Sequence, residues 1–348
     1  MNSPSRPPLA IAVLIAFGVV LAQALLVPLF AAPAANLAPR DLPVVVAGPA
    51  PAAQAMAGQL RQAEPGAFEV TIVPDAAAAE AALRDRDAYA AFVIGTTGVT
   101  LNTASGGSPV VAQLLGQAAS QIGAATGQQV QVVDVVPGSP DDPRGGGFAA
   151  GFLPLALTAM LAGIALALRV RGRWATAAGV VTFGVLAGLV GATVLQGWLG
   201  VLSGDFLFNA AAIALFATAV TGTLAGLGSL LGTPGIGLGA LLVFLVGNPL
   251  SAVAAAPQLL PQPWGEIGQY LPIGAGGTLL RSTAFFDGSG GATAAWVLAA
   301  YAVVGLALVL LGRKGGGPAS EVTPATVTES GEAAEAREAG RRLGAVAN

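Results

Sequence analysis

Few residues of this chain have the side chains that chemistry at a protein site usually requires. The 348 residues include no Cys and no His, which excludes thiolate nucleophiles, disulfides, imidazole bases and the common soft metal sites. Carboxylates and a hydroxyl do occur between residues 36 and 147, but their spacing forms neither a general acid–base pair nor a metal site. These residues are Asp75, Glu80, Asp85, Asp87 and Ser105. No phosphate-binding loop is present either. We therefore predict a protein that is not an enzyme, with no catalytic residue, metal ion or cofactor.

A second group of candidates lies inside the long apolar stretches of the chain, where polar side chains are rare. The amides there are Gln23, Asn209 and Asn248, and no charged residue lies within these stretches. Asn248 precedes Pro249, which interrupts the hydrogen-bond ladder of a helix, so the pair predicts either a structural kink or a gate that contacts substrate. Asn209 and Gln23 are candidates for the same roles, gating or helix packing. Transport coupled to buried carboxylates is disfavoured.

Long intervals without charge dominate the sequence. Hydrophobic residues make up 54% of the chain and charged residues 9%, whereas soluble domains carry about 25% charged residues. A segment of roughly 20 apolar residues is long enough to cross the hydrocarbon core of a bilayer. Such segments occur at 9–29, 148–168, 175–195, 207–227, 235–255 and 292–311. They predict an α-helical integral membrane protein with six transmembrane helices, of which the first is alternatively a cleaved signal peptide.

Basic residues next to these segments predict their orientation. Arg6 precedes the first segment, three arginines separate the second from the third, and Arg313 and Lys314 follow the sixth. Six spans bring all of these residues to one side, which the positive-inside rule makes cytoplasmic. We therefore expect both termini in the cytoplasm. The net charge of -3 and the lack of a basic stripe give no support to nucleic-acid binding.

Residues 36–147 have a different texture, because charges return and short β-type runs alternate with helix formers. Strands are predicted at 42–47, 68–73, 89–94, 98–102 and 130–136, with helices at 50–62, 76–86 and 108–125. This alternation is typical of a small α/β domain with a largely parallel sheet. The orientation makes it an extracytoplasmic domain between helices 1 and 2. The predicted organisation is a first transmembrane helix within 1–31, this domain at 36–147, a five-helix transmembrane domain at 148–313 and a disordered cytoplasmic tail at 315–348.

The outer loop at 257–291 combines apolar anchors with few charges. Trp264 and Tyr270 are residue types that favour the membrane interface, and Arg281 is the single basic residue of the loop. We expect short helices that lie on, or dip into, the outer leaflet. The alternative is a loop packed over the ends of the helices.

This order of segments resembles the permeases of type-2 ABC exporters, and most closely their phage-infection-protein-like branch. One matching stretch is an Ala/Glu helix followed by a charged turn and an aromatic strand, AAEAALRDRDAYAAFVIG. Another is the Gly-x-Pro-x-Ser pattern of the fifth span, and the last is a run of Leu-Pro, Leu-Pro, Arg and aromatic-Phe-x-Gly. These stretches are Ala78–Gly95, Gly247–Ser251, Leu260-Pro261, Leu271-Pro272 and Arg281–Gly288.

The resemblance implies a function and partners. A member of that family is a subunit of a homodimer or heterodimer of permeases in the lipid bilayer of the bacterial plasma membrane, and a separate cytoplasmic ATPase drives it. Its expected activity is to move, or help to secrete, an amphipathic or lipid-like substrate. The alternative is a non-transporting envelope protein whose outer domain binds a partner, a phage or a cell-wall component.

Overall fold

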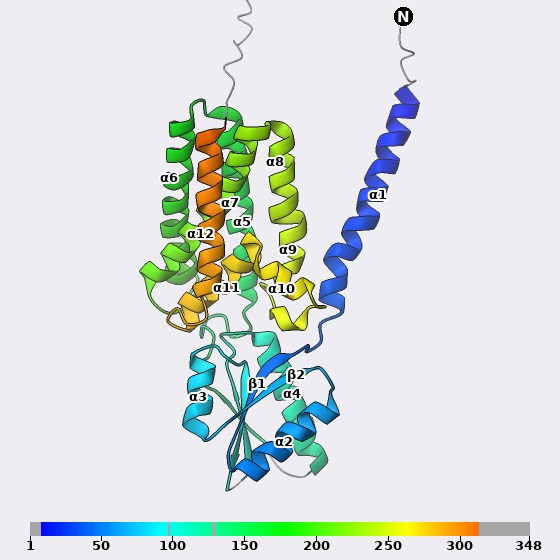
Figure 1. Ribbon diagram of the computed structural model, residues 1–348, viewed down its shortest axis with the longest axis vertical. Helices are drawn as coiled ribbons and strands as arrows, with labels where there is room; N and C mark the ends of the chain where they lie inside the picture. Colours follow the sequence, from blue (N-terminus) through cyan, green and yellow to red (C-terminus); the bar gives the residue numbers. More distant parts are fainter. Residues whose placement is uncertain (1–7, 97, 127–129, 313–348) are drawn as a thin grey trace, which may run out of the picture. The chain divides into compact units, whose positions relative to one another are not determined.

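The computed structural model describes residues 8–96, 98–126 and 130–312. It is mostly helical, with one five-stranded sheet that is inserted in the sequence between the first long helix and the others (Figure 1). The tail at 315–348 lies outside the described residues, so its predicted disorder stays a prediction.

The inserted sheet domain alternates strands and helices as predicted. Its strands lie in the order β2-β1-β3-β4-β5, and every neighbouring pair is parallel except the antiparallel pair β3 and β4. The prediction of a largely parallel sheet is therefore confirmed. The elements are β1 (Leu42–Ala47), α2 (Ala50–Ala63), β2 (Phe68–Val73), α3 (Ala76–Arg84), β3 (Ala90–Gly95), β4 (Gly98–Thr103), α4 (Pro109–Thr126) and β5 (Gln131–Asp134).

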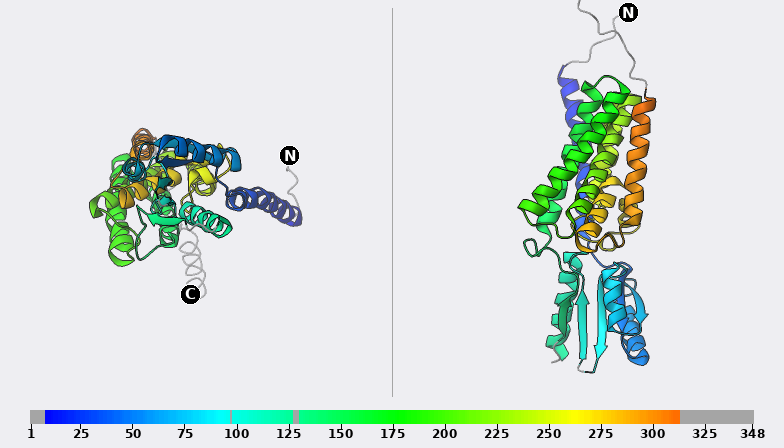
Figure 2. Two further views of the ribbon diagram at one scale, coloured as in Figure 1. Left: turned by 90° about the horizontal axis from the view of Figure 1, so that it is seen from below. Right: turned by 90° about the vertical axis from the view of Figure 1, so that its left-hand side faces the viewer.

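Helices cover both faces of this sheet, which explains the apolar character of its central strands. Val44 and Val46 of β1 pack with residues of α2 and α4, whereas Val45 and Ala47 face α3. All four are buried. The two faces thus form two separate hydrophobic clusters. Figure 2 shows the strands and helices of this domain from two further directions.

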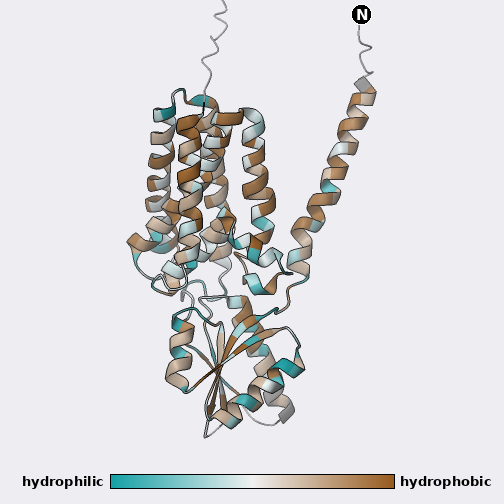
Figure 3. Ribbon diagram, viewed as in Figure 1, coloured by the Kyte–Doolittle hydropathy of each residue, from teal (hydrophilic) through white to brown (hydrophobic). Residues whose placement is uncertain are grey.

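Six helices in the described part of the chain are long and apolar enough to cross a membrane, and they coincide with the six predicted segments. Figure 3 shows the apolar residues that run along them. They are α1 (Pro8–Ala35), α5 (Gly146–Arg169), α6 (Arg173–Ala192) with the π-helical turns η1 (Thr193–Trp198), α7 (Phe206–Leu231), the continuous run of α8 (Thr233–Ala240), η2 (Leu241–Val246) and α9 (Gly247–Leu250), and α12 (Ala292–Leu311).

The helix α7 lies at the centre of this group, since α5, α6, α11 and α12 all pack against it. By contrast, α1 is exposed along its length and meets the other helices only near its C-terminal end (Figure 1). The first span was predicted to end at Leu29, but the helix continues to Ala35 through Pro28 and Pro33.

The fifth span was predicted to reach Ala255 and instead ends at Leu250. Pro249 has no N–H to donate to the preceding turn, and the helix runs through π-type turns just before it. Ser251 then ends the helix, because its Oγ donates to the Asn248 carbonyl at 2.7 Å. Residues 251–255 therefore form a loop.

The predicted outer loop contains three short helices. These are η3 (Pro257–Leu259), α10 (Trp264–Gln269) and α11 (Pro272–Phe285). Most residues of α11 are buried, so this helix belongs to the interior of the fold and is not a surface segment. The expectation of short helices is confirmed, and the alternative of packing over helix ends describes α11 better than an interfacial position does.

Candidate functional site

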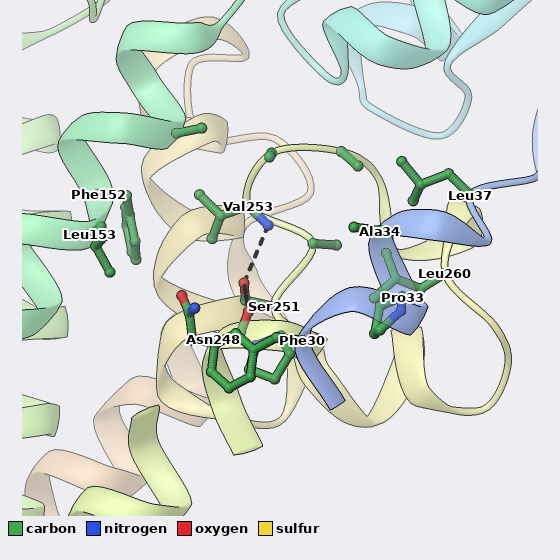
Figure 4. A pocket seen from close by; sticks show the side chains of 15 residues that line it. Phe30, Pro33, Ala34, Leu37, Phe152, Leu153, Asn248, Ser251, Val253 and Leu260 are labelled. Carbon is green, nitrogen blue, oxygen red and sulfur yellow. Dashed lines mark hydrogen bonds between the residues drawn. The ribbon is translucent and has the colours of Figure 1, made fainter. Parts of the chain in front are cut away.

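The C-terminal end of α1 and the start of α5 enclose an apolar cleft of about 330 Å³ together with the loop that follows α9 (Figure 4). Phe30 and Leu37 line it from the side of α1, and Phe152 and Leu153 line it from α5. The polar lining is limited to main chain and small side chains of 248–255. The cleft therefore suits a hydrocarbon group better than a polar metabolite.

Asn248 and Pro249, which the sequence singled out, both line this cleft. The main-chain carbonyl of Asn248 accepts hydrogen bonds from the backbone N–H and Oγ of Ser251. Its side-chain amide has no hydrogen-bond partner among the residues that the structure describes. The pair thus ends the helix at the cleft, and the free amide is available to a ligand.

Asn209 lies elsewhere and serves helix packing. It is fully buried near the start of α7, where its Nδ2 donates to Gln196 Oε1 at 2.9 Å and to the Ser203 carbonyl at 2.7 Å. Its Oδ1 accepts a hydrogen bond from Thr283 Oγ1 at 2.8 Å. Gln23 is exposed on α1. Of the four candidate gate or packing residues, only two therefore meet at one site.

The three residues predicted for the outer segment also differ in their positions. The side chains of Trp264 and Tyr270 are 52% and 63% exposed, as expected of interfacial anchors, but Arg281 is only 6% exposed. Arg281 is therefore buried within the fold and is not exposed beside Trp264 and Tyr270. Its position on α11 explains this, because α11 packs between α7, α12 and the sheet domain.

Arg281 joins the sheet domain to the helices. Its Nη1 donates to the Gly107 carbonyl at 2.7 Å and more weakly to the Ala255 carbonyl at 3.4 Å, and Nη2 donates to the Val253 carbonyl at 3.0 Å. The guanidinium also lies over the ring of Phe148, 4.6 Å from its centre. Its buried Nε has no hydrogen-bond partner among the described residues.

A second arginine lies beside it, at a position that could not be predicted from the sequence. Arg86 comes from the turn after α3, and its Nη1 donates to the Thr278 carbonyl of α11 at 2.9 Å. Between the two arginines, Tyr89 is partly buried and donates its hydroxyl to Gln258 Oε1 at 3.1 Å. Arg84, two residues earlier, is exposed and pairs with Glu80. The local sequence does not distinguish Arg84 from Arg86, because burial of Arg86 depends on contacts with residues almost 200 positions away.

The charges of this pair are strongly perturbed. Burial, and to a smaller extent the neighbouring Arg86, lower the pKa of Arg281 to about 10, while Tyr89 acts in the opposite direction. Burial also lowers the pKa of Arg86 and raises the pKa of the Tyr89 phenol. Arg86 and Arg281 are thus poorly solvated, and the positive charge of Arg86 makes the charged form of Arg281 less favourable.

Three cavities meet at this place. Arg86, Tyr89 and Arg281 line a narrow cavity of about 10 Å³, which shares the loop residues Ser251, Ala252, Val253 and Ala255 with the apolar cleft. On its other side, Arg86, Tyr89, Pro257 and Thr278 are shared with a cavity of about 310 Å³ that is lined mainly by polar side chains. The arginine pair therefore lies between an apolar compartment and a polar one.

A comparison of the chain with models of protein families, with curated proteins and with solved structures finds no match in any of the three. The class of protein is consequently defined by the fold and the site alone. The described residues contain six helices that are long and apolar enough to cross a membrane, and a small α/β sheet domain between the first two.

Proposed function

We propose that this chain is a permease-like subunit in the bacterial plasma membrane and that it moves, or helps to export, an amphipathic or lipid-like molecule. The observation that carries the proposal is the apolar cleft between α1 and α5. One of its walls is α1, a helix that is exposed along its length. In a bilayer such a cleft would admit a hydrocarbon chain directly from the lipid, without passage through water.

The charge pattern supports an extracytoplasmic sheet domain. The arginines of the connection at 169–173 lie at the end of α5 that is remote from the sheet domain (Figure 1). The positive-inside rule makes that end cytoplasmic. The cleft, which lies near the sheet domain, would then open toward the outer leaflet.

A binding experiment tests the role of the cleft. Ala149→Trp places an indole in the cleft, and Ala150→Trp places the same group on an exposed neighbouring position of α5 that does not line the cleft. We expect the first variant to bind a fluorescent single-chain amphiphile about tenfold less tightly, since the indole would occupy the space of several methylene groups. Equal affinity in both variants and the wild type would exclude this cleft as the binding site.

In the described part of the chain, the connections that an ATPase partner implied by the family resemblance would contact are short. The connection from α5 to α6 is only Val170–Gly172, and α7 is joined to α8 through Gly232 alone. This observation favours the second candidate function, a non-transporting envelope protein whose outer domain binds a partner, a phage or a cell-wall component. Copurification with a cytoplasmic ATPase, together with lost efflux of apolar compounds in cells that lack the gene, would favour the permease. Absence of both effects would favour the envelope protein.

A further inference from the structure

The arginine pair has no acidic counterpart. In the part of the chain that the structure describes, the only ion pair is Arg84 with Glu80, so no carboxylate lies within 4.0 Å of Arg86 or Arg281. Arg281 is only 6% exposed and Arg86 is partly buried. Such a loss of water around unpaired cations is unfavourable unless other groups compensate for it. Main-chain carbonyls supply part of that compensation, but they carry no net charge.

A purely structural role for Arg281 explains only some of its donors. The bonds from Nη1 and Nη2 hold Gly107 and Val253 in place, yet Nε is buried without a partner. If Arg281 served only to connect segments of the fold, a second cation nearby would be unfavourable, because Arg86 repels Arg281 and lowers its pKa. An anion with several acceptor oxygens would satisfy the free donor and remove this repulsion at the same time.

The neighbouring cavities indicate what kind of anion this is. The loop 251–255 forms the wall between the arginine pair and the apolar cleft, since four of its residues line both. A molecule with its hydrocarbon part in the cleft would therefore have its polar end next to this wall. On the far side, the larger cavity gives room for the rest of a headgroup. Its lining includes the Glu266 carboxylate, which would repel a further negative charge there.

Resting on the function proposed above, we infer that Arg86, Arg281 and Tyr89 bind the phosphate-type headgroup of an anionic amphiphile whose hydrocarbon chain lies in the cleft. The narrow cavity holds about 10 Å³, roughly the space of one water molecule. Binding thus requires the loop 251–255 to move. Ala252 in this loop has a φ of 53°, a left-handed conformation that is uncommon for residues other than glycine.

The first test concerns charge. The purified full chain in detergent is titrated with dioleoylphosphatidic acid and with dioleoylglycerol, which differ by the phosphate, and bound lipid is counted by native mass spectrometry. We expect the wild type to prefer the phosphate-bearing lipid by about tenfold or more, since charge-assisted hydrogen bonds are the stronger ones. Arg86→Gln should reduce the preference to about twofold or less. Arg84→Gln, the exposed neighbour, should retain it.

The outcomes separate the two proposals. If neither lipid binds, the proposed function is overturned and the headgroup site with it. If both lipids bind equally and Arg86→Gln changes neither, the headgroup site is overturned while binding in the cleft stands. Inorganic phosphate forms the third arm: if it binds as tightly as phosphatidic acid, the site takes a free anion and the assignment to a lipid headgroup is wrong.

The second test concerns the loop and does not remove an arginine. A Cβ atom built on Gly277 would lie 3.6 Å from the Cβ of Val253, within the range of disulfide-bonded pairs. Because the chain has no cysteine of its own, Val253→Cys combined with Gly277→Cys would lock the loop to α11 only under oxidising conditions. We expect the oxidised protein to lose its preference for phosphatidic acid and the reduced protein to regain it. An unchanged preference in the oxidised form would contradict the required loop movement and overturn the site.

Discussion

Two buried polar residues, Asn209 and Arg281, both join segments that are distant in the sequence, but their hydrogen bonding differs. Both the Nδ2 and the Oδ1 of Asn209 are bonded, so this residue is a completed structural connection between α7, α11 and the turn after η1. Arg281 keeps one buried donor free and has a cation beside it. The contrast separates a packing residue from a residue with unused binding capacity.

Asn209→Ala should destabilise the protein. The change removes the hydrogen bonds that Asn209 Nδ2 donates to Gln196 Oε1 and to the Ser203 carbonyl, while Thr283 Oγ1 retains its bond to the Leu280 carbonyl. We expect the free energy of unfolding to fall by about 1–3 kcal/mol. Thr158→Ala is the matched control, because this exposed hydroxyl bonds only to carbonyls of its own helix. Thermal unfolding in detergent measures both variants. Equal stability of the two would contradict the packing role of Asn209.

Tyr89 should make the stability of the protein sensitive to alkaline pH. Burial raises the pKa of its phenol above the ordinary value of 10.0, and Arg86 and Arg281 offset only part of the increase. The folded protein then keeps the proton at pH values where the unfolded chain releases it. The contribution of Tyr89 to the free energy of unfolding therefore falls as the pH rises above about 10. In Tyr89→Phe this loss should be smaller, as unfolding curves at about pH 8 and about pH 10.5 would show. Parallel changes in both proteins would argue against the perturbed phenol.

At the scale of elements, small residues set how closely the helices approach. Gly305 of α12 lies against Gly222 and Gly226 of α7, and a Cβ atom at position 305 would come within 2.5 Å of the backbone of Gly222. Such contacts permit dispersion packing and close backbone approach where lipid offers no hydrophobic driving force between helices. The crossing of α7 and α12 therefore depends on glycine at this point.

Gly305→Ala should lower the stability of the helix bundle, because the backbone of α7 cannot move aside like a flexible side chain. Gly237→Ala in α8 is the matched control, since nothing lies within 4 Å of a Cβ atom built there. The control should leave stability unchanged or raise it by up to about 1 kcal/mol through helix propensity. The unfolding temperature of each variant in the same detergent provides the measurement. A loss of stability in the control, or none in Gly305→Ala, would refute the explanation.

Most elements could be predicted from the sequence because their signals are local. Intervals without charge mark the six long helices, and the alternation of strands and helices marks the sheet domain. The end of the fifth helix was missed because the effect of Pro249 depends on the π-type turns before it and on Ser251 after it. Asn248 and Pro249 were identifiable as exceptions in an apolar stretch. Arg86 was not, since its surroundings arise only when the turn after α3 meets α11.

At the scale of the whole described fold, function and orientation are linked. The cleft and the arginine pair both lie near the sheet domain, whereas the arginines at 169–173 lie at the other end of the helices. If the positive-inside rule holds, both candidate binding regions belong to the outer half of the membrane. The chain would then handle amphiphiles of the outer leaflet, so the sidedness of the sheet domain decides which lipid pool it can reach.

Single cysteines can determine this sidedness, because the chain has none of its own. Asp85→Cys places a thiol on the exposed surface of the sheet domain, and Leu231→Cys places one at the half-exposed far end of α7. A membrane-impermeant maleimide added to spheroplasts should label the first variant at once and the second only after permeabilisation. This order is expected because the three arginines at 169–173 lie at the same end of the helices as Leu231. The cytoplasmic ends of membrane helices carry the excess of positive charge. The reverse order would place the sheet domain in the cytoplasm, and the cleft would then face the inner leaflet.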